Sequence, residues 1–396
     1  MVTVFTGGPV FVGDGSVLEG VQVHVEEGRI SRIVDTSHSR PRNAEVVQLN
    51  GCFLLPGLID CHVHLCMDAG PDPLGTLSNE AVPLTAIKAA EFAAETLLSG
   101  VTAVRDMGGL AGVDLVLRDA IGTGRIPGPR MLASGQLICM TGGHGWQIGR
   151  QADGRTEVMR AVREQILAGA DLIKLMATGG VMTPGVEPGS EQFTESELRA
   201  GVKEAHKAGK KTATHAQGTK GIKNALLAGI DSIEHGIYLN DECLDLMLEK
   251  GVPLIPTMSA LFHIEKMGVE AGIPEFAVAK TLRVKPFFLE SVRMAREAGV
   301  SGAMGTDAGT PFNGHGQNLE ELVFMVESGF SEEEALKAAT GTAARVLGLE
   351  EEIGTIAVGR QADLLLVEGN PLQDIGLLQD RENIRMIVQG GRVVKG

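Results

Sequence analysis

In this 396-residue chain, the residues best suited to metal binding and catalysis are histidines, a lysine and an aspartate near the ends of short apolar runs. His62 and His64 lie two positions apart in the run 54–65, and side chains two apart on a strand share one face. Imidazole nitrogens and carboxylate oxygens bind Zn²⁺ and similar ions, and an open coordination position makes such a site catalytic. Four other runs place a ligand-type residue late in the run: Lys174, His215, His235 and Asp307.

Lys174 is the unusual member of this set, because it is a cation inside the apolar run 171–177. Its charge would repel a metal ion, and burying it costs several kcal/mol unless it is neutralised. Burial lowers the pKa of a lysine from roughly 10.4, and a neutral amine can add CO₂ to form a carbamate with two anionic oxygens. A carboxylated Lys174 would bridge two metals, whereas a Lys174 paired with an acid would leave a site for one.

A recurring junction between helical and apolar patterns predicts the elements that position these residues. Glycine tolerates the left-handed conformation that closes a helix, and the rhythm of helix, glycine and strand is typical of a parallel α/β sheet. The segments 194–197 and 331–334 read as capping boxes that begin two of the helices. Six helical patterns end in such a glycine: Gly100, Gly169, Gly209, Gly229, Gly251 and Gly299.

Strands are expected near residues 55, 102, 130, 171, 211, 232, 253 and 301. Eight strands with intervening helices predict a (β/α)8 TIM barrel, whose strands open with their carboxyl ends on one face. Both chain ends show short strand patterns instead, at 21–25, 29–34, 363–367 and 386–394. We therefore predict a small β-sandwich domain from residues 1–51 and 354–396, beside a catalytic barrel of residues 52–353.

Composition excludes several classes of partner. The formal charge is −15, with 50 acidic against 35 basic residues and no basic stripe, so nucleic acid is not an expected partner. The 5 cysteines show no CxxC spacing and predict a reducing compartment without disulfides. The chain begins without a secretory pattern and contains no run of eighteen apolar residues, so we predict a cytoplasmic protein with no membrane partner. We also expect a homo-oligomer.

The ensemble of strand-end residues resembles the binuclear amidohydrolase superfamily, and the resemblance covers essentially the whole chain. It implies two divalent metal ions, most simply zinc, which lower the pKa of a bound water. A bridging hydroxide would then be the nucleophile, and Asp307 would take its proton and pass it to the leaving amine. The resemblance assigns one metal to His62, His64 and Asp307, the other to His215 and His235, and the bridge between them to Lys174 carboxylated by CO₂.

Two further motifs resemble the branch of Xaa-Pro dipeptidases and related hydrolases of N-acyl amino acids. These are the segments 141–146, which contains His144 and Trp146, and 233–238, which ends in Tyr238. The resemblance implies that His144 polarises the scissile carbonyl and that Tyr238 binds the substrate carboxylate or the developing oxyanion. We therefore predict hydrolysis of the amide bond in dipeptides or N-acyl amino acids with a free C-terminal carboxylate. Packing is the favoured interpretation of Trp146, while His315 is open between substrate contact and a loop position.

Other functions compete with this one. The nearest is a cyclic amide hydrolase of the imidazolonepropionase or hydantoinase type, which strand-end ligands of the same kind would also serve. A deaminase is disfavoured, because the segment 216–219 lacks the expected glutamate after the fifth-strand histidine. A barrel that serves as a non-catalytic scaffold would have lost ligands, whereas all are present here. The glycine-rich segment 177–182 lacks the spacing of a phosphate loop and predicts a substrate loop at the barrel mouth.

Overall fold

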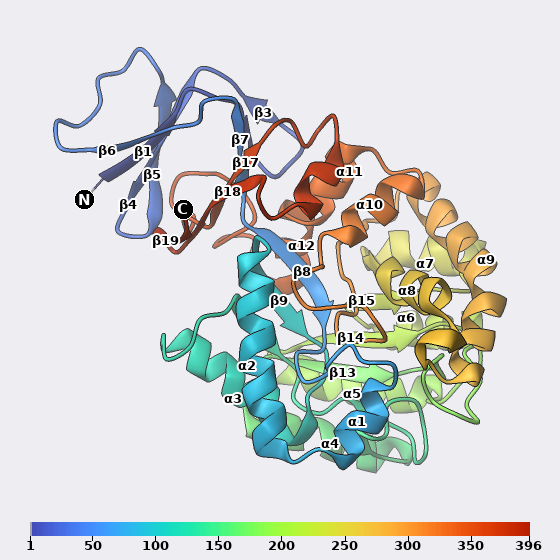
Figure 1. The fold of residues 1–396 in the computed structure, drawn as a ribbon. Helices are drawn as coiled ribbons and strands as arrows, with labels where there is room; N and C mark the ends of the chain where they lie inside the picture. The colour runs from blue at the N-terminus through green and yellow to red at the C-terminus, as the bar shows by residue number, and fades with distance from the viewer. Residues whose placement is uncertain (1) are drawn as a thin grey trace. The chain divides into compact units, whose positions relative to one another are not determined.

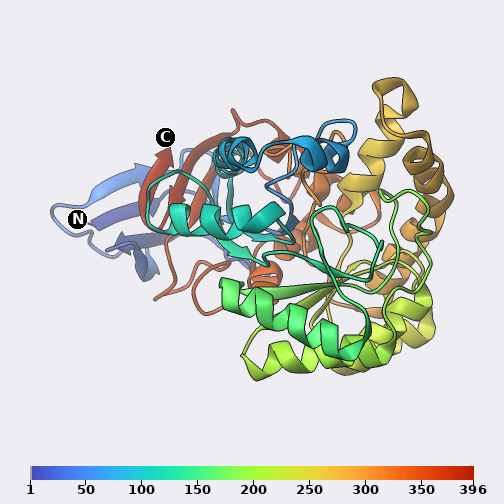
Figure 2. The ribbon, with the colours of Figure 1, turned by 90° about the horizontal axis from the view of Figure 1, so that it is seen from below.

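The computed structural model describes residues 2–396 and has an α/β fold with two layers of short strands at the chain ends (Figure 1). Those strands form two sheets whose inner faces share one buried core, which includes Phe5, Val23, Leu54 and Leu366, so they make a β-sandwich. Figure 2 shows blue N-terminal and red C-terminal strands next to one another. The first sheet has the order β5 (Arg29–Asp35), β4 (Val21–Glu26), β1 (Val2–Thr6), β6 (Glu45–Gln48); the second has β19 (Arg392–Lys395), β18 (Ile384–Gln389), β17 (Leu364–Glu368), β7 (Cys52–Pro56), β2 (Val10–Phe11), β3 (Val17–Leu18).

The remaining strands form the (β/α)8 barrel that the sequence predicts. The strands β13 (Leu172–Met176), β14 (Lys211–Ala216), β15 (Ser232–His235) and β16 (Leu254–Ile255) are parallel neighbours, as expected for repeated strand–helix units. Isolated bridges from Gly302 to Leu254 and from Ala308 to Val63 connect β16 with β8 and continue the ring. One sheet has the order β10 (Arg130–Ala133), β9 (Val101–Asp106), β8 (Leu58–Val63), and the other β12 (Arg150–Gln151), β11 (Ile138–Cys139), β13 (Leu172–Met176), β14 (Lys211–Ala216), β15 (Ser232–His235), β16 (Leu254–Ile255).

Two strand expectations need correction. Residues near 55 form β7, which pairs with β17 in the sandwich, and the first barrel strand is β8, beginning after Gly57. The chain near 301 forms no regular strand, because its hydrogen bonds change partner along its length. Ser301 and Ala303 bond to Leu254, whereas Asp307 donates its backbone N–H to the carbonyl oxygen of His62.

The helices follow the predicted junctions. All six predicted junction glycines have a positive φ, from 65° at Gly251 to 97° at Gly169, which confirms that they close the preceding helices. The helices are α1 (Pro73–Asn79), α2 (Val82–Leu98), α3 (Val113–Gly122), α4 (Gly154–Ala168), α5 (Glu195–Lys207), α6 (Thr219–Ala228), α7 (Asp241–Lys250), α8 (Met258–Met267), α9 (Glu275–Ala298), α10 (Glu320–Glu327), α11 (Glu332–Ala338) and α12 (Gly341–Leu347).

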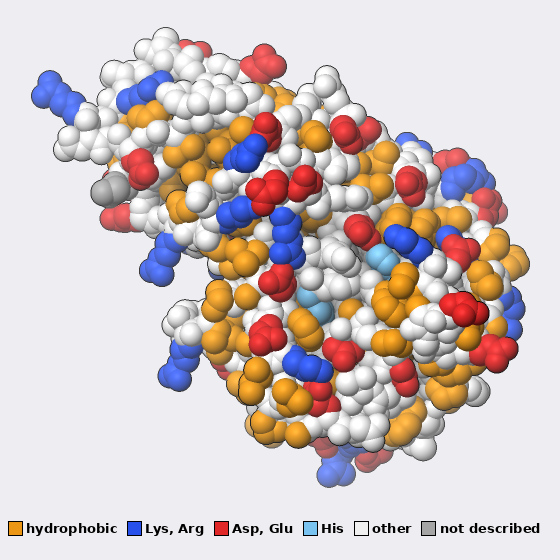
Figure 3. Space-filling model, in the orientation of Figure 1, with side chains coloured by type: hydrophobic (Ala, Val, Ile, Leu, Met, Phe, Trp, Pro, Cys, Tyr) orange, Lys and Arg blue, Asp and Glu red, His pale blue; other side chains and the backbone are white. Residues whose placement is uncertain are grey.

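By its internal contacts the chain divides into two compact units. One contains the residues up to Asp60, Ala94–Ala103 and Gly316–Gly396, and the other contains Cys61–Ala93 and Val104–His315. The domain boundaries proposed from the sequence, 1–51 with 354–396 and 52–353, stay a prediction. Acidic and basic side chains are interspersed on the face shown in Figure 3. Across residues 2–396, no helix is long and apolar enough to cross a membrane.

Both predicted capping boxes are confirmed, and one of them allows a stability test. Thr194 accepts a hydrogen bond from the backbone of Glu197, whose carboxylate accepts one from the backbone of Thr194. Thr194→Ala is expected to lower the free energy of unfolding by about 1 kcal/mol. Urea unfolding measures the change. Thr156→Ala, at an exposed position inside α4, is the matched control and is expected to be neutral or slightly stabilising. Equal losses in both variants would contradict the prediction.

Candidate metal centre

The register of β13 and β14 places Lys174 and His215 on one face of the barrel sheet. Lys174 pairs with Ala213, and Met176 pairs with His215. Side chains alternate along each strand, so Lys174 and His215 point the same way, offset by two residues. Both are buried, with exposed fractions of 2% and 3%, as expected for residues that line the inside of a barrel end.

His235 reaches the site through a backbone distortion. In register with β14, Glu234 pairs with His215, so simple alternation would turn the next residue, His235, to the other face. His235 instead has a left-handed φ of 72°. Glu234 and His235 therefore both face His62. The Glu234 carboxylate lies 2.8 Å from Nδ1 of His62, and the ring centroids of His235 and His62 are 5.3 Å apart.

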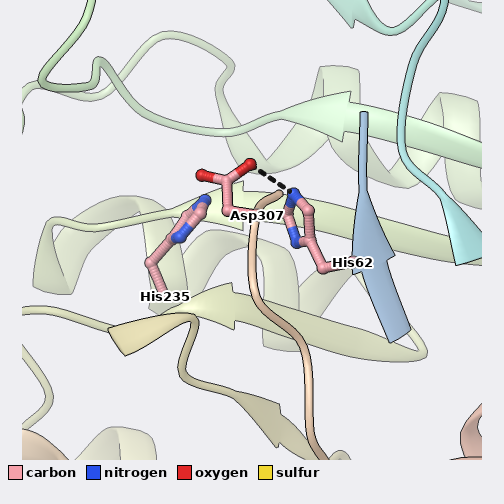
Figure 4. A group of neighbouring side chains, drawn as sticks. All are labelled: His62, His235 and Asp307. Atoms are coloured by element: carbon pink, nitrogen blue, oxygen red, sulfur yellow. Dashed lines mark ion pairs between the residues drawn. The ribbon is translucent and has the colours of Figure 1, made fainter. Parts of the chain in front are cut away.

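Asp307 lies at the centre of the cluster. Figure 4 shows its carboxylate between the imidazoles of His62 and His235, and the ligand atoms of these three residues lie within 4.8 Å of one another. Its Oδ1 is 3.3 Å from Nε2 of His62 and 3.3 Å from Nε2 of His64. Burial raises the pKa of Asp307, but the two imidazoles outweigh it and hold that pKa well below its usual value. The carboxylate is therefore ionised, as a metal ligand must be.

Each of the four histidines uses one ring nitrogen to bond a protein oxygen. His62 bonds Glu234 through Nδ1, and His64 bonds the carbonyl oxygen of Gly108 through Nδ1 at 3.0 Å. Such bonds fix the ring and the tautomer of a metal-binding histidine and turn its other nitrogen inward. The remaining two bonds run from His235 Nδ1 to Thr257 Oγ1 at 2.7 Å and from His215 Nε2 to the carbonyl oxygen of Gly179 at 3.0 Å.

Within residues 2–396, the buried Nζ of Lys174 has no hydrogen-bond partner. Burial lowers its pKa to about 8 from an ordinary 10.5. At pH 7 roughly a tenth of such amines are neutral, against roughly three in ten thousand for an ordinary lysine. An unpartnered buried amine that is readily deprotonated is the group that CO₂ addition would satisfy, so the donor set fits a carbamate-bridged metal pair.

A buried ionic network supports the cluster, and sequence reasoning missed it. Glu234 is fully buried and accepts hydrogen bonds from Arg105 at 2.8 Å and from Ser232 at 2.6 Å. Burial raises the pKa of Glu234, but Arg105 and His62 outweigh it, so the pKa falls well below 4.5. Arg105 also donates to the carbonyl oxygen of Cys61 at 2.7 Å. The only sequence signal was a charged residue beside His235 in an apolar strand.

The cavity beside the cluster has two lobes that share His144, His215, His235 and Asp307. One lobe, with about 460 Å³ of empty space, is also lined by His62, His64 and Lys174. The other encloses about 410 Å³ of empty space that is partly open to solvent, and more than half of its lining residues are apolar. We call it the apolar lobe; its apolar side chains include Ile237, Pro256, Ala260, Leu261, Ile264 and Phe288.

His144 lies between the two lobes. Its ring centroid is 4.4 Å from that of His215. Burial lowers the pKa of His144 to about 3, so the ring is neutral near pH 7. A neutral imidazole carries one N–H and can donate it to a substrate oxygen.

The structure does not bring every candidate into the cavity. Tyr238 is absent from the lining of both lobes, and its ring packs 5.2 Å from that of Phe287. Trp146, expected to pack, is instead 44% exposed, and its backbone N–H donates to the carbonyl oxygen of Gly143. His315 is partly buried and lines neither lobe; it stacks on Phe92 and bonds the carbonyl oxygen of Met67 at 2.8 Å.

Comparison with known proteins agrees with this fold. A model of the amidohydrolase family matches residues 53–394, so the chain belongs to the amidohydrolase family. Ochratoxinase of Aspergillus niger is 32% identical over 427 residues, covering 100% of this chain and 87% of that protein. The structure of a Xaa-Pro dipeptidase with methionine in its active site is 34% identical to this chain, with a TM-score of 0.91. The structure of a prolidase complexed with N-methylphosphonate-L-proline is also 34% identical, with a TM-score of 0.93. Both comparisons cover 100% of both chains. The protein is a hydrolytic enzyme of this family.

Proposed function

We propose that this protein is a binuclear metal-dependent amidohydrolase that cleaves the amide bond of dipeptides or N-acyl amino acids with a free C-terminal carboxylate. The observation that carries the proposal is the convergence of four tethered histidines, ionised Asp307 and unpartnered Lys174 on one cavity. The similarity to a Xaa-Pro dipeptidase and to ochratoxinase supports an amide substrate.

The residues fit a pair of divalent ions, zinc being the simplest choice. His62, His64 and Asp307 would hold one ion and His215 and His235 the other, with carboxylated Lys174 between them. When bound, such ions lower the pKa of a coordinated water and polarise the carbonyl of the substrate. Asp307 is also the member of the set suited to carry a proton, because its carboxylate is ionised and touches both His62 and His64. It would take the proton of the attacking water and deliver it to the leaving amine.

The apolar lobe favours substrates with a hydrophobic side chain. Across the described lining of both lobes, Lys174 is the one lysine or arginine, so an ionic partner for the substrate carboxylate is not built into the cavity wall. Recognition of that carboxylate by Tyr238 remains part of the proposal. A cyclic amide hydrolase is the second candidate, because a neutral ring would satisfy the same apolar lobe. The homo-oligomeric state and the cytoplasmic location also remain predictions.

Hydrolysis of a substrate panel tests the function. With Zn²⁺ and bicarbonate present, we expect Xaa-Pro dipeptides or N-acyl amino acids with apolar side chains to turn over faster than hydantoins or dihydropyrimidines. Asp307→Asn is expected to lower kcat by about 10²–10⁴-fold, because the amide cannot accept the proton. Substrates and products are separated and quantified by liquid chromatography, because ring opening of a hydantoin or dihydropyrimidine gives a ureido acid without a free amine and a dipeptide already carries one. Faster turnover of the cyclic amides would favour the second candidate, and no turnover of any member would contradict both.

A further inference from the structure

We propose that Thr183 is a positioning residue that selects the tautomer of His144, so that His144 presents its Nε2–H to the substrate carbonyl. The inference rests on the proposed function, in which His144 polarises that carbonyl. Thr183 lies in the loop between β13 and α5, directly after the glycine-rich segment 177–182 that is expected to contact substrate. Its exposed fraction is 1%, so its hydroxyl must find partners within the protein.

The hydrogen bonds around Thr183 distinguish the two tautomers. Its Oγ1 lies 2.8 Å from Nδ1 of His144 and 3.3 Å from the backbone nitrogen of Gly145. The Gly145 N–H can only donate, so it uses a lone pair of the hydroxyl oxygen and leaves the hydroxyl hydrogen available. If that hydrogen is donated to Nδ1, the single proton of the neutral ring lies on Nε2.

The opposite tautomer is disfavoured by the same geometry. With a proton on Nδ1, Thr183 would accept from both His144 and Gly145, and its own hydrogen would lack an acceptor. No other hydrogen-bond acceptor for this hydroxyl is found within residues 2–396. A buried hydrogen-bond donor without an acceptor raises the free energy of the folded protein, so the tautomer with the proton on Nε2 is favoured.

Side chains of α9 bind the loop that contains Thr183. Lys280 of α9 is 6% exposed and donates from Nζ to the carbonyl oxygens of Thr183, at 2.7 Å, and Val186. Arg283 of the same helix pairs with Glu187 farther along the loop. These contacts hold the backbone of Thr183 in place, so its hydroxyl meets the ring at a fixed position.

Close packing restrains the ring on its other side. A Cβ added at Gly180 would lie 2.3 Å from Nε2 of His144, closer than real Cβ atoms approach such an atom. The ring is thus held between the Gly180 backbone and the Thr183 hydroxyl. Its Nε2 has no hydrogen-bond partner among the described residues, and His144 lines both lobes of the cavity. The free N–H is therefore available to a substrate oxygen.

Nitrogen NMR of the zinc-loaded, full-length protein tests the tautomer without any substrate. Histidines are labelled with ¹⁵N, and the signals of His144 are assigned with His144→Gln. We expect the Nε2–H pattern in the unmodified protein, a change to mixed or Nδ1–H pattern in Thr183→Val, and its restoration in Thr183→Ser. An Nδ1–H pattern in the unmodified protein, or an unchanged pattern in Thr183→Val, would overturn the inference.

Kinetics with the best amide of the panel gives the second readout. Thr183→Val is expected to lower kcat about 10- to 100-fold with KM changed less than about 3-fold, while Thr183→Ser keeps kcat within about 3-fold. Metal content should stay equal in all three proteins, which separates this role from a loss of zinc. Loss of kcat in Thr183→Ser as well would indicate a packing role and overturn the inference. If no amide is hydrolysed, the proposed function fails while the NMR result still decides the tautomer.

Discussion

Lys174→Met is expected to lower kcat/KM by about 10³-fold or more, which corresponds to about 4 kcal/mol of lost transition-state stabilisation. Methionine has nearly the length of lysine but cannot add CO₂, so the variant removes the proposed bridge and keeps the volume. We expect the metal content to fall from two ions per chain to one or none. Mass spectrometry of metals and steady-state assays measure the two effects.

A labelling experiment connects this loss to carboxylation. Metal-loaded protein equilibrated with ¹³C-bicarbonate should show one carbamate carbon signal that Lys174→Met lacks. Lys88→Met is the matched control, because Lys88 is a partly buried lysine paired with Glu80 at 2.6 Å and does not line the cavity. It should retain the signal, both metals and activity within about 2-fold. Two metals and full activity in Lys174→Met would refute the proposed carbamate bridge.

The second large effect is on stability: Glu234→Ala is expected to lower the free energy of unfolding by about 3–5 kcal/mol. The variant leaves the buried guanidinium of Arg105 without its carboxylate partner and removes the carboxylate that contacts Nδ1 of His62. Because the pKa of Glu234 is lowered from 4.5, the carboxylate contributes its stabilisation at neutral pH and loses it only on acidification through the folded-state pKa. Urea unfolding at pH 7 measures the change, and zinc affinity should fall about 10- to 100-fold.

Two comparisons make this prediction sharp. Glu297→Ala removes one partner of the exposed pair with Arg293, whose side chains are 54% and 50% exposed, and should change stability by less than about 1 kcal/mol. The double variant Arg105→Met with Glu234→Met replaces both buried charges and should be more stable than Glu234→Ala, since no uncompensated charge remains. A loss in Glu234→Ala as small as that in Glu297→Ala would show that the network contributes little.

Sequence patterns predicted the helices, the barrel and the group of ligand-type residues, because glycine closures and strand-end polar residues are local signals. They could not show how His235 joins the site. Alternation along β15 assigns one face to Glu234 and the other to His235, and only the left-handed backbone at His235 brings both toward His62. Thr257 and Asp307, with φ of 57° and 60°, are also left-handed. Such backbone angles cost about 1–3 kcal/mol each and are set by surrounding packing, which a sequence pattern does not contain.

The same limit explains the misplaced strand near residue 55. The apolar run 54–65 reads as one strand, but it is divided after Pro56 between β7 of the sandwich and β8 of the barrel. Conversely, the segment that carries Asp307 lacks a regular strand because its hydrogen bonds go first to Leu254 and then to His62. Pairing partners distant in sequence decide both cases.

The pairing of β7 with β17 has a consequence for biosynthesis. Phe53 lies opposite Val367, and Leu55 lies opposite Leu365, so β7 is synthesised long before its partner β17. While the ribosome is still translating the intervening segment, the nascent chain exposes an unpaired apolar strand edge, which is prone to intermolecular association. A bound chaperone that shields residues 52–56 until translation ends would therefore raise the yield of correctly assembled protein.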